Sequence, residues 1–196
     1  MCRKESLKIR TYRIVPLSQR SGLLEWCSNT MPIGTLLGGD SRKSGAHGRY
    51  YPDVKNTVCM EAYKKAAKNS LEKYKKICEA FPPVMKFILM ELFPSAQEFY
   101  RGRNFYTKSV AATSMVGHIL GIGDRHLNNI LVDLKTGELV HIDFGVAFDK
   151  GKILPTPELI PFRLTRDIVD GFGPAGVEGV FRYKVPHFIC YSNRST

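Results

Sequence analysis

The sequence lacks the features of a membrane-spanning, secreted or disulfide-bonded protein. Its longest apolar stretches, residues 84–92 and 115–122, are too short to cross a bilayer and contain Lys86, Glu91 and His118. The basic amino-terminal residues are not followed by an apolar core, so no secretory signal is predicted. The five cysteines are scattered and form no CxxC pair, which argues against a disulfide framework or zinc site and predicts a reducing, intracellular environment.

The chain also lacks internal repeats, low-complexity tracts and the signatures of RRM, KH, helix-turn-helix and zinc-finger modules. Its 196 residues are 43% hydrophobic and 24% charged, which is enough apolar content for the core of one or two soluble domains. The net charge of +11 is compatible with an acidic partner such as ATP, nucleic acid or anionic lipid, and equally with a solvated basic surface. Neither a membrane partner nor a direct nucleic-acid partner is predicted.

Strand-like patterns come first along the chain. Residues 9–18 are rich in β-branched residues and are predicted to form a strand that Pro16 ends. Residues 21–27 are predicted to form a second short strand after a Ser-Gly turn. Residues 28–56 are rich in Gly, Pro and Ser and show little periodicity, so they are expected to be loop with at most one helical turn.

Helical patterns follow. Apolar residues at steps of three or four, with lysines on the other face, predict a helix over residues 57–81 that Pro82 and Pro83 end. A second helix is predicted over residues 84–93. A third, poor in charge and rich in small residues, is predicted over 104–122 as a buried central helix. Strands, then helices, then one hairpin indicate an α+β fold.

Residues 130–142 form two apolar runs around a Gly-containing turn, which predicts a β-hairpin. Asn129 precedes the first strand and Asp143 follows the second, so the turn returns both side chains to one end of the ribbon. An amide oxygen and a carboxylate held together suit Mg²⁺, which prefers oxygen ligands. Asp124 lies on the loop that enters the hairpin and can hold a base beside a metal-bound phosphate. His141 is interpreted as a core or loop histidine.

The spacing of these polar residues matches the general design of a kinase site. Such a site has a catalytic Asp, an Asn five positions later, and an Asp-Phe-Gly triplet beyond a hairpin. The plainer interpretation is that Asp124, Asn129 and Asp143 are turn and cap residues, because Asp and Gly are common in turns. The joint pattern, with a hairpin of the right length between its parts, favours chemistry.

The loop itself departs from ordinary protein kinases, since it reads Asp124-Arg125-His126 where they have His-Arg-Asp. The reversed D-R-H-x-x-N motif, together with residues 12–27 and 141–181, resembles the phosphatidylinositol 3-kinase-related protein kinases. These belong to the PI3/PI4-kinase-like superfamily, and the resemblance covers most of the chain.

The resemblance implies an architecture. Residues 1–183 would be part of a PI3/PI4-kinase-type catalytic domain, with a remnant of the N-lobe in 1–24 and a hinge in 25–27. Residues 28–183 would form a mostly helical C-lobe, and residues 184–196 would be a divergent tail.

The resemblance also implies roles for the loop residues. Asp124 would deprotonate the substrate hydroxyl or only orient it, because a metaphosphate-like transfer demands little base strength. His126 would donate a hydrogen bond to the γ-phosphoryl oxygens as charge shifts during transfer. Asn129 and Asp143 would bind Mg²⁺ or Mn²⁺. Arg125 is interpreted as a structural residue.

Nucleotide binding is implied for the hinge and the hairpin. Glu25 would offer a backbone carbonyl and Cys27 a backbone N–H to the adenine of ATP, while Trp26 would form a wall of the pocket. Leu131 and Ile142, which flank the metal ligands, would supply an apolar floor.

Residues 143–163 would be the activation loop. Before Arg163 this segment contains only Lys150 and Lys152 as basic residues. Lipid 3-kinases carry a denser basic cluster there to meet phosphorylated head groups, so a protein substrate is favoured over a phosphoinositide.

The implied activity is that of an ATP-dependent serine/threonine protein kinase of the DNA damage response. Its substrates would be proteins with Ser/Thr-Gln sites, its partners would include DNA-damage sensor proteins, and the full-length protein would be a nuclear homodimer. The 196 residues contain no Gly-rich phosphate loop and no identifiable strand lysine with a helical Glu partner. We therefore expect a C-lobe with a hinge, arising by truncation, alternative splicing or an incomplete gene model.

Three other interpretations remain open from the sequence. A catalytically silent fragment would act only by binding partners of a complete kinase. A phosphoinositide lipid kinase would use the same motifs on a different substrate. A nucleic-acid binder is suggested by the net charge alone.

Overall fold

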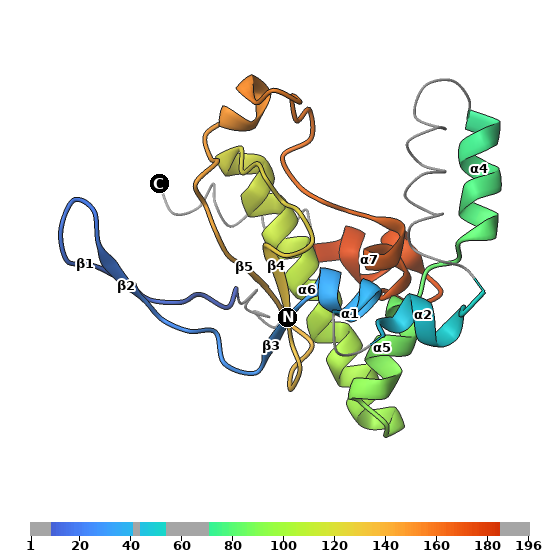
Figure 1. Cartoon of the computed structure of the whole chain (residues 1–196). Helices are drawn as coiled ribbons and strands as arrows, with labels where there is room; N and C mark the ends of the chain where they lie inside the picture. Colours follow the sequence, from blue (N-terminus) through green and yellow to red (C-terminus); the bar gives the residue numbers. More distant parts are fainter. Residues whose placement is uncertain (1–8, 41–43, 54–70, 185–196) are drawn as a thin grey trace.

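The computed structural model describes residues 9–40, 44–53 and 71–184. Figure 1 shows a helical body with small sheets at one side. The strands and helices described are β1 (Ile14–Pro16), β2 (Gly22–Leu24), β3 (Thr30–Pro32), α1 (Ile33–Gly38), α2 (Ala46–Tyr50), α4 (Leu71–Ala80), α5 (Met85–Leu92), α6 (Ala96–Leu120), β4 (Ile130–Asp133), β5 (Leu139–His141), η1 (Lys150–Ile153), α7 (Arg166–Asp170) and η2 (Gly176–Glu178). This mixture of helices and short strands agrees with the predicted α+β class.

Helix α6 runs through the centre of the body, with α5 and α7 beside it (Figure 1). Small residues from Ser109 to Ser114 are buried, which lets neighbouring elements approach the helix closely. The predicted buried central helix is therefore confirmed, but it begins at Ala96 and not near 104. Ser95 caps its start: the Ser95 hydroxyl accepts the N–H of Glu98 at 3.2 Å and donates to the Glu98 carboxylate at 2.6 Å.

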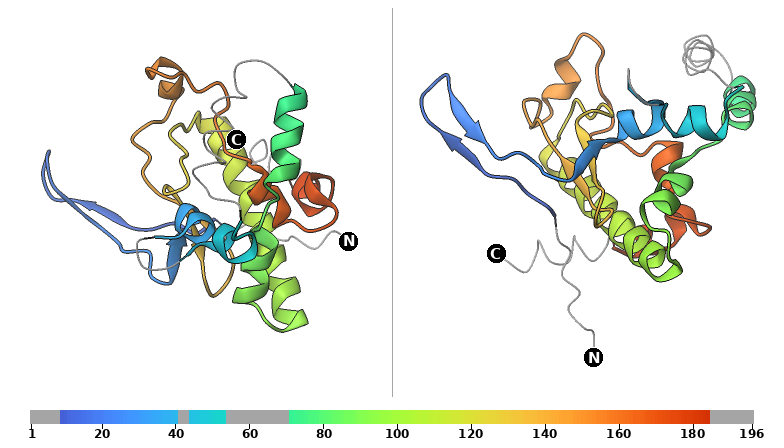
Figure 2. Two further views of the ribbon diagram at one scale, coloured as in Figure 1. Left: turned by 45° about the vertical axis from the view of Figure 1, so that its right-hand side comes forward. Right: turned by 60° about the horizontal axis from the view of Figure 1, so that its bottom comes forward.

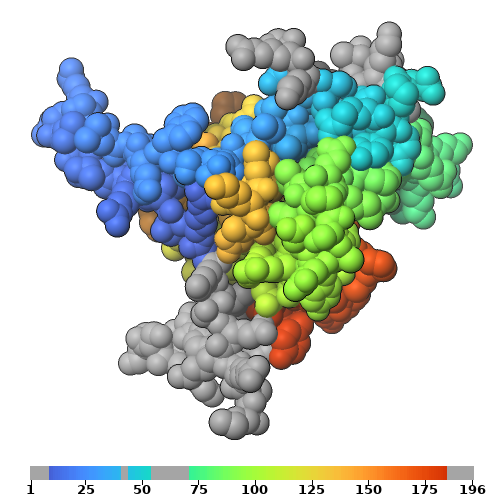
Figure 3. All heavy atoms as spheres, turned by 90° about the horizontal axis from the view of Figure 1, so that it is seen from below, coloured from blue at the N-terminus to red at the C-terminus, as the bar shows by residue number. Residues whose placement is uncertain are grey.

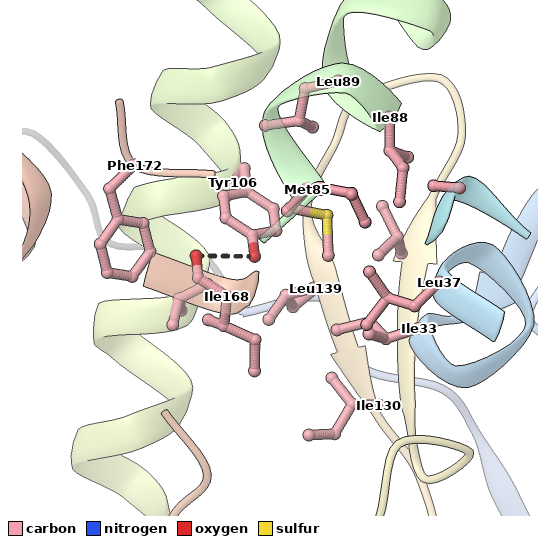
Figure 4. Close-up of a cluster of buried hydrophobic side chains, with 14 of the residues drawn as sticks. Ile33, Leu37, Met85, Ile88, Leu89, Tyr106, Ile130, Leu139, Ile168 and Phe172 are labelled. Atoms are coloured by element: carbon pink, nitrogen blue, oxygen red, sulfur yellow. Dashed lines mark hydrogen bonds between the residues drawn. The ribbon is translucent and has the colours of Figure 1, made fainter. Parts of the chain in front are cut away.

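The hydrophobic core joins these helices to the sheet. Tyr106 of α6 lies at its centre, and its hydroxyl donates to the carbonyl of Ile168 at 3.1 Å (Figure 4). Burial raises the pKa of Tyr106 well above its usual value, so the hydroxyl stays protonated and remains a donor. The buried side chains of the core cluster are Ile33, Leu37, Ala46, Val84, Met85, Ile88, Leu89, Phe93, Tyr106, Val110, Ile130, Val132, Leu139, Ile168 and Phe172.

A three-stranded antiparallel sheet carries the hairpin. Strands β4 and β5 pair with Ile130 opposite His141, so the predicted hairpin is confirmed. Strand β3 pairs with the other edge of β4, about 100 residues away in sequence, as Met31 opposite Val132 shows. The expectation that residues 28–56 form loop with at most one helical turn was wrong, because this range contains β3, α1 and α2. Elements this short give no detectable periodicity in sequence.

Strands β1 and β2 form a separate hairpin that projects from the body (Figure 2). Both strands were predicted, but each has only three residues, and all of them are exposed. The projection is also visible in the space-filling view, where the hairpin extends to one side of the face formed by α5, α6 and the β4–β5 turn (Figure 3).

The remaining helix predictions are confirmed where they can be compared. Helix α4 covers the end of the helix predicted over 57–81, and residues 57–70 lie outside the described part. Helix α5 matches the helix predicted over 84–93 to within one residue at each end. Within the ranges that the structure describes, no helix combines the length and apolar character needed to span a membrane.

The Tyr106 hydrogen bond leads to a stability prediction. Replacing Tyr106 by Phe leaves the buried carbonyl of Ile168 without this donor, which we expect to lower the free energy of unfolding by about 1–3 kcal/mol. Tyr100→Phe is the matched control, because Tyr100 lies on the same helix with 64% of its surface exposed, and it should change stability by less than about 0.5 kcal/mol. Urea denaturation of the three chains gives the comparison. Equal midpoints for both variants would show that the bond contributes nothing.

Candidate active site at the end of the β4–β5 hairpin

The hairpin ladder continues past its last strand residue and brings Asn129 beside Ile142. The N–H of Ile142 donates to the carbonyl of Asn129 at 3.0 Å. Asp143 follows directly and is exposed, whereas Asn129 is buried, with 6% of its surface exposed. The structure therefore brings Asn129 and the start of the Asp-Phe-Gly triplet to one end of the ribbon, as predicted.

The loop from Asp124 to Asn129 is closed on itself. The side-chain amide of Asn129 donates from Nδ2 to the carbonyl of Asp124 at 3.0 Å, and its backbone N–H donates to the carbonyl of His126 at 3.0 Å. Asp124 has φ +55°, in the left-handed region that few residues other than Gly, Asn and Asp adopt readily. Asp124 and Asn129 are thus neighbours in space as well as in the motif.

Arg125 ties the loop to the end of the hairpin. Its guanidinium donates to the carbonyls of Gly123 at 2.9 Å, Ile142 at 2.7 Å and Asp143. The side chain is buried, with 5% exposed, and its ring partner is Phe144 at 5.5 Å. Burial lowers the pKa of Arg125, while the nearby carboxylates oppose that shift. Three carbonyl bonds from one buried side chain agree with the structural role expected from the sequence.

His126 is exposed. Its Nδ1 accepts the backbone N–H of Asn128 at 3.2 Å. Since one ring nitrogen of a neutral imidazole is an acceptor and the other a donor, the proton then belongs on Nε2. His126 therefore offers an N–H to solvent at the edge of the site.

The donor set at this end fits a hard divalent cation. The amide nitrogen of Asn129 is used by Asp124, which leaves the amide oxygen available as a ligand. One carboxylate oxygen of Asp143 accepts the N–H of Gly145 at 3.2 Å, which leaves the other oxygen available. Two protein oxygens suit Mg²⁺, which commonly takes its remaining ligands from phosphates and water. Among the described residues no group of three or more His, Cys, Asp or Glu gathers as a metal site.

The predicted hinge lies at the base of the projecting hairpin. The Glu25 backbone N–H donates to the Arg13 carbonyl at 2.8 Å, and the Glu25 side chain accepts the Arg13 N–H at 2.9 Å. The Cys27 carbonyl accepts the Thr30 hydroxyl at 2.6 Å. Trp26 is 89% exposed, so within the described part of the chain it forms no wall of a pocket, and that role stays a prediction.

The two residues predicted to lie beneath the adenine have little exposed surface. Leu131 is buried, with 8% exposed, and lies opposite Val140 on the strand face that alternates with the core residues of β4. Ile142 is partly buried. A nearby cavity of about 180 Å³ is lined by residues that include Tyr12, His141 and Phe144. Its mostly apolar lining borders the end of the ribbon, on either side of Asp143 in sequence.

Two site neighbours were missed by the sequence analysis. Glu158, in the segment predicted to be the activation loop, accepts the backbone N–H of Asp124 at 2.7 Å. Arg163 donates to the carbonyl of Arg125 at 3.4 Å. Both contacts reach backbone atoms more than 30 residues away, and no local pattern marks a side chain that binds a distant main chain. The structure therefore adds Glu158 and Arg163 to the neighbourhood of the candidate site.

The arrangement of Asp124, Asn129 and Asp143 is of the kind found in kinases. Comparison with known proteins gives the family of the chain. The family model described as phosphatidylinositol 3- and 4-kinase matches residues 1–194. The chain belongs to this family. It is 54% identical over 185 residues to the serine-protein kinase ATM of Sus scrofa, which covers 92% of the chain. It is 51% identical over 183 residues to the serine/threonine-protein kinase ATM of Drosophila melanogaster.

Solved structures agree with this placement. The FAT and kinase domain of CtTel1 matches 91% of the chain and is 49% identical, with a TM-score of 0.80. A Tel1 kinase described as a butterfly symmetric dimer matches 95% of the chain and is 41% identical, with a TM-score of 0.79. The predicted PI3/PI4-kinase-like fold is therefore confirmed. The chain spans 6% of the pig relative and 13% of the first CtTel1 chain, so it corresponds to a small part of these proteins.

His141 gives the site a pH-dependent stability. Burial, and then the charge of Arg125, lowers the pKa of His141 from 6.5 to about 4. As the pH falls below about 6.5, the unfolded chain takes up this proton before the folded chain does. The contribution of His141 to the free energy of unfolding is therefore most favourable near neutral pH. It falls progressively as the pH is lowered towards 4.

We expect His141→Gln to remove that dependence. Between about pH 6 and pH 4 the parent chain should lose up to about 1.4 kcal/mol of unfolding free energy per pH unit more than the variant, with the steepest loss near the middle of the range. Denaturant titrations at several pH values in EDTA measure the difference without a bound metal. His118→Gln, at an exposed histidine, should keep the parental slope. Parallel slopes for the parent and His141→Gln would contradict the expectation.

Proposed function

We propose that this chain carries the metal-binding and base-bearing part of an ATP- and Mg²⁺-dependent serine/threonine protein kinase. The observation that carries the proposal is the joint placement of Asp124, Asn129 and Asp143 at one end of the β4–β5 hairpin, held by Arg125. Family membership and the names of the ATM and Tel1 relatives support it. Because the chain spans only a small part of those relatives, the kinase activity of the whole protein is part of the proposal.

The proposed reaction moves the γ-phosphoryl group of ATP to a serine or threonine hydroxyl. Asp124 accepts or orients the proton of that hydroxyl. His126 donates its Nε2 hydrogen to the phosphoryl oxygens, where negative charge shifts during transfer. Asn129 and Asp143 would hold the cation. Mg²⁺, when bound, would supply positive charge that offsets the negative charge of the nucleotide phosphates.

Nucleotide positioning is assigned to the hinge and the strand face. In this proposal the Glu25 carbonyl and the Cys27 N–H meet the adenine edge, Trp26 covers one side of the base, and Leu131 with Ile142 lies beneath it. The hinge leads directly into β3, which pairs with β4 with Pro32 opposite Leu131, so the proposed hinge and floor are joined through one sheet.

Substrates and partners follow from the kinase relatives. We propose protein substrates with Ser-Gln or Thr-Gln sites, a role in the DNA damage response, DNA-damage sensor proteins as partners, and action in the nucleus. The solved relatives described as a CtTel1 dimer with C2 symmetry and as a symmetric Tel1 dimer support a homodimeric full-length protein. The sparse basic residues of the activation loop, Lys150 and Lys152, favour protein over lipid substrates.

The metal assignment can be tested on the chain itself. Asp143→Asn removes the carboxylate charge, so we expect Mg²⁺ to strengthen binding of a fluorescent ATP analogue to the parent about tenfold more than to the variant. Asp149→Asn is the control, because Asp149 is an exposed acid of the activation loop that pairs with Lys152. Fluorescence titrations of the three proteins, each with Mg²⁺ and with EDTA, give the affinities to be compared. Equal enhancement by Mg²⁺ in the parent and Asp143→Asn would reject Asp143 as a ligand.

Catalysis is tested in a chimera, which we call the exchange kinase, in which this chain replaces the matching segment of the CtTel1 FAT and kinase fragment. Asp124→Ala should reduce turnover on a Ser-Gln peptide by about a hundredfold or more while ATP binding changes little. Near-parental turnover in Asp124→Ala would reject the role of the base. Transfer to a phosphoinositide in place of the peptide would favour the lipid-kinase alternative.

The chain alone is expected not to phosphorylate protein at a useful rate. Phosphoryl transfer depends almost entirely on positioning and electrostatic clamping of ATP, and these 196 residues contain no Gly-rich phosphate loop. The measurement uses purified chain, radiolabelled ATP, Mg²⁺ or Mn²⁺ and a Ser-Gln peptide, with Asp143→Ala as the background. Transfer clearly above that background would show that hinge and C-lobe suffice. No transfer in the exchange kinase either would favour a silent binding fragment.

A further inference from the structure

The main chain of Asp124 is held on both of its sides. Its carbonyl accepts from the Asn129 amide at 3.0 Å, and its N–H donates to the Glu158 carboxylate at 2.7 Å. Because φ is +55°, the backbone at Asp124 lies in a region that needs support from its surroundings. The direction of the Asp124 side chain therefore depends on these two bonds, and only the first is local to the motif.

The Glu158 carboxylate packs closely against Gly123 and Gly151, where a residue with a side chain would collide with it. A methyl carbon added to Gly123 would lie 2.6 Å from its Oε2 atom, and one added to Gly151 would lie 3.0 Å from the same atom. The backbone N–H of Glu158 in turn donates to the carbonyl of Gly151 at 3.0 Å. The carboxylate thus sits against two glycines, one before the proposed base and one in the activation loop.

Further bonds join the same two segments. The N–H of Gly123 donates to the carbonyl of Val146 at 2.9 Å, and Arg163 donates to the carbonyl of Arg125 at 3.4 Å. The activation loop is therefore attached to the loop of the base at its beginning, at Glu158 and at its end. Among these contacts, only the one from Glu158 is made to the backbone of Asp124. Because its acceptor is a charged carboxylate, this hydrogen bond is a strong one.

We propose that Glu158 is a positioning residue that sets the orientation of Asp124, so that transfer requires the activation loop to be seated on the loop of the base. This inference rests on the proposed function. Glu158 acts through Asp124 and touches no reacting atom.

The surroundings of Glu158 separate this role from a packing role. The residue is only partly buried and lies outside the core cluster. Cavities of about 260 Å³ and 310 Å³ both include Glu158 and Leu159 in their linings. Water can therefore reach the Asp124 N–H when the carboxylate is removed, and loss of Glu158 leaves no dry void. We expect a large effect on catalysis and a small one on stability.

The activity test uses the exchange kinase with Glu158→Ala and Glu158→Gln. A misplacement of about 1 Å can cost about a hundredfold, so Glu158→Ala should lower kcat by about that factor. The KM for ATP should stay within about threefold, because the metal ligands are held by the hairpin and by Arg125. Glu158→Gln keeps an acceptor oxygen without its charge and should lower kcat by about tenfold.

Asp170→Ala is the matched control. The Asp170 carboxylate also accepts a backbone N–H, that of Lys86 at 2.9 Å, but it lies in the helical body away from the loop of the base. This variant should lower the melting temperature and leave kcat within about twofold. If Glu158→Ala kept kcat within twofold while Asp124→Ala abolished transfer, the inference would be overturned and the proposed function would stand. Retained turnover in Asp124→Ala would instead reject both.

A second measurement reports the bond without any activity. In the isotope-labelled 196-residue chain, hydrogen exchange of the Asp124 amide should be at least about tenfold faster in Glu158→Ala than in the parent, because the carboxylate protects this N–H. Asp170→Ala should leave that rate unchanged. Equal exchange rates in the parent and Glu158→Ala would overturn the inference whatever the kinase assay showed.

Discussion

A single buried guanidinium holds the candidate site together. Arg125 donates to carbonyls on both segments that carry the acids, so the loop of Asp124 and the end of strand β5 cannot separate without leaving this charge unpaired in the interior. An uncompensated buried charge costs several kcal/mol, which is more than any other single polar contact at the site is expected to contribute. The relative placement of Asp124, Asn129 and Asp143 depends on that penalty.

Stability and function are divided between different parts of the molecule. The packed core around Tyr106 joins α5, α6, α7 and the inner face of β4, and it contains the large buried side chains. The β1–β2 hairpin contains none, and Trp26 at its base is almost fully exposed. The proposed metal ligands are attached to the sheet beside this core, whereas the proposed adenine contacts are divided between the buried strand residue Leu131 and the exposed Trp26.

Much of the fold and site was predictable because the signals are local. The β4–β5 hairpin shows alternation around a Gly-containing turn, and its geometry alone predicted that Asn129 and Asp143 come together. Strand β3 was missed because three residues show no period and its partner lies about 100 residues away. The start of α6 could have been found, since Ser95 and Glu98 have the spacing of a capping box in the sequence. The role of Glu158 could not be predicted, because its partner is a backbone N–H. Every residue except proline has this group, so the sequence does not mark which one is bound.

Both proposed site acids have a left-handed backbone, Asp124 with φ +55° and Asp143 with φ +57°. Short side chains that bond to their own backbone tolerate this region, whereas β-branched residues do not. The backbone conformation at these two positions therefore restricts which residues fit there, independently of their catalytic or metal-binding chemistry. Natural variation there should be confined to Asp, Asn and Gly, and inactivity of a valine or threonine variant would report a displaced main chain as much as a lost charge.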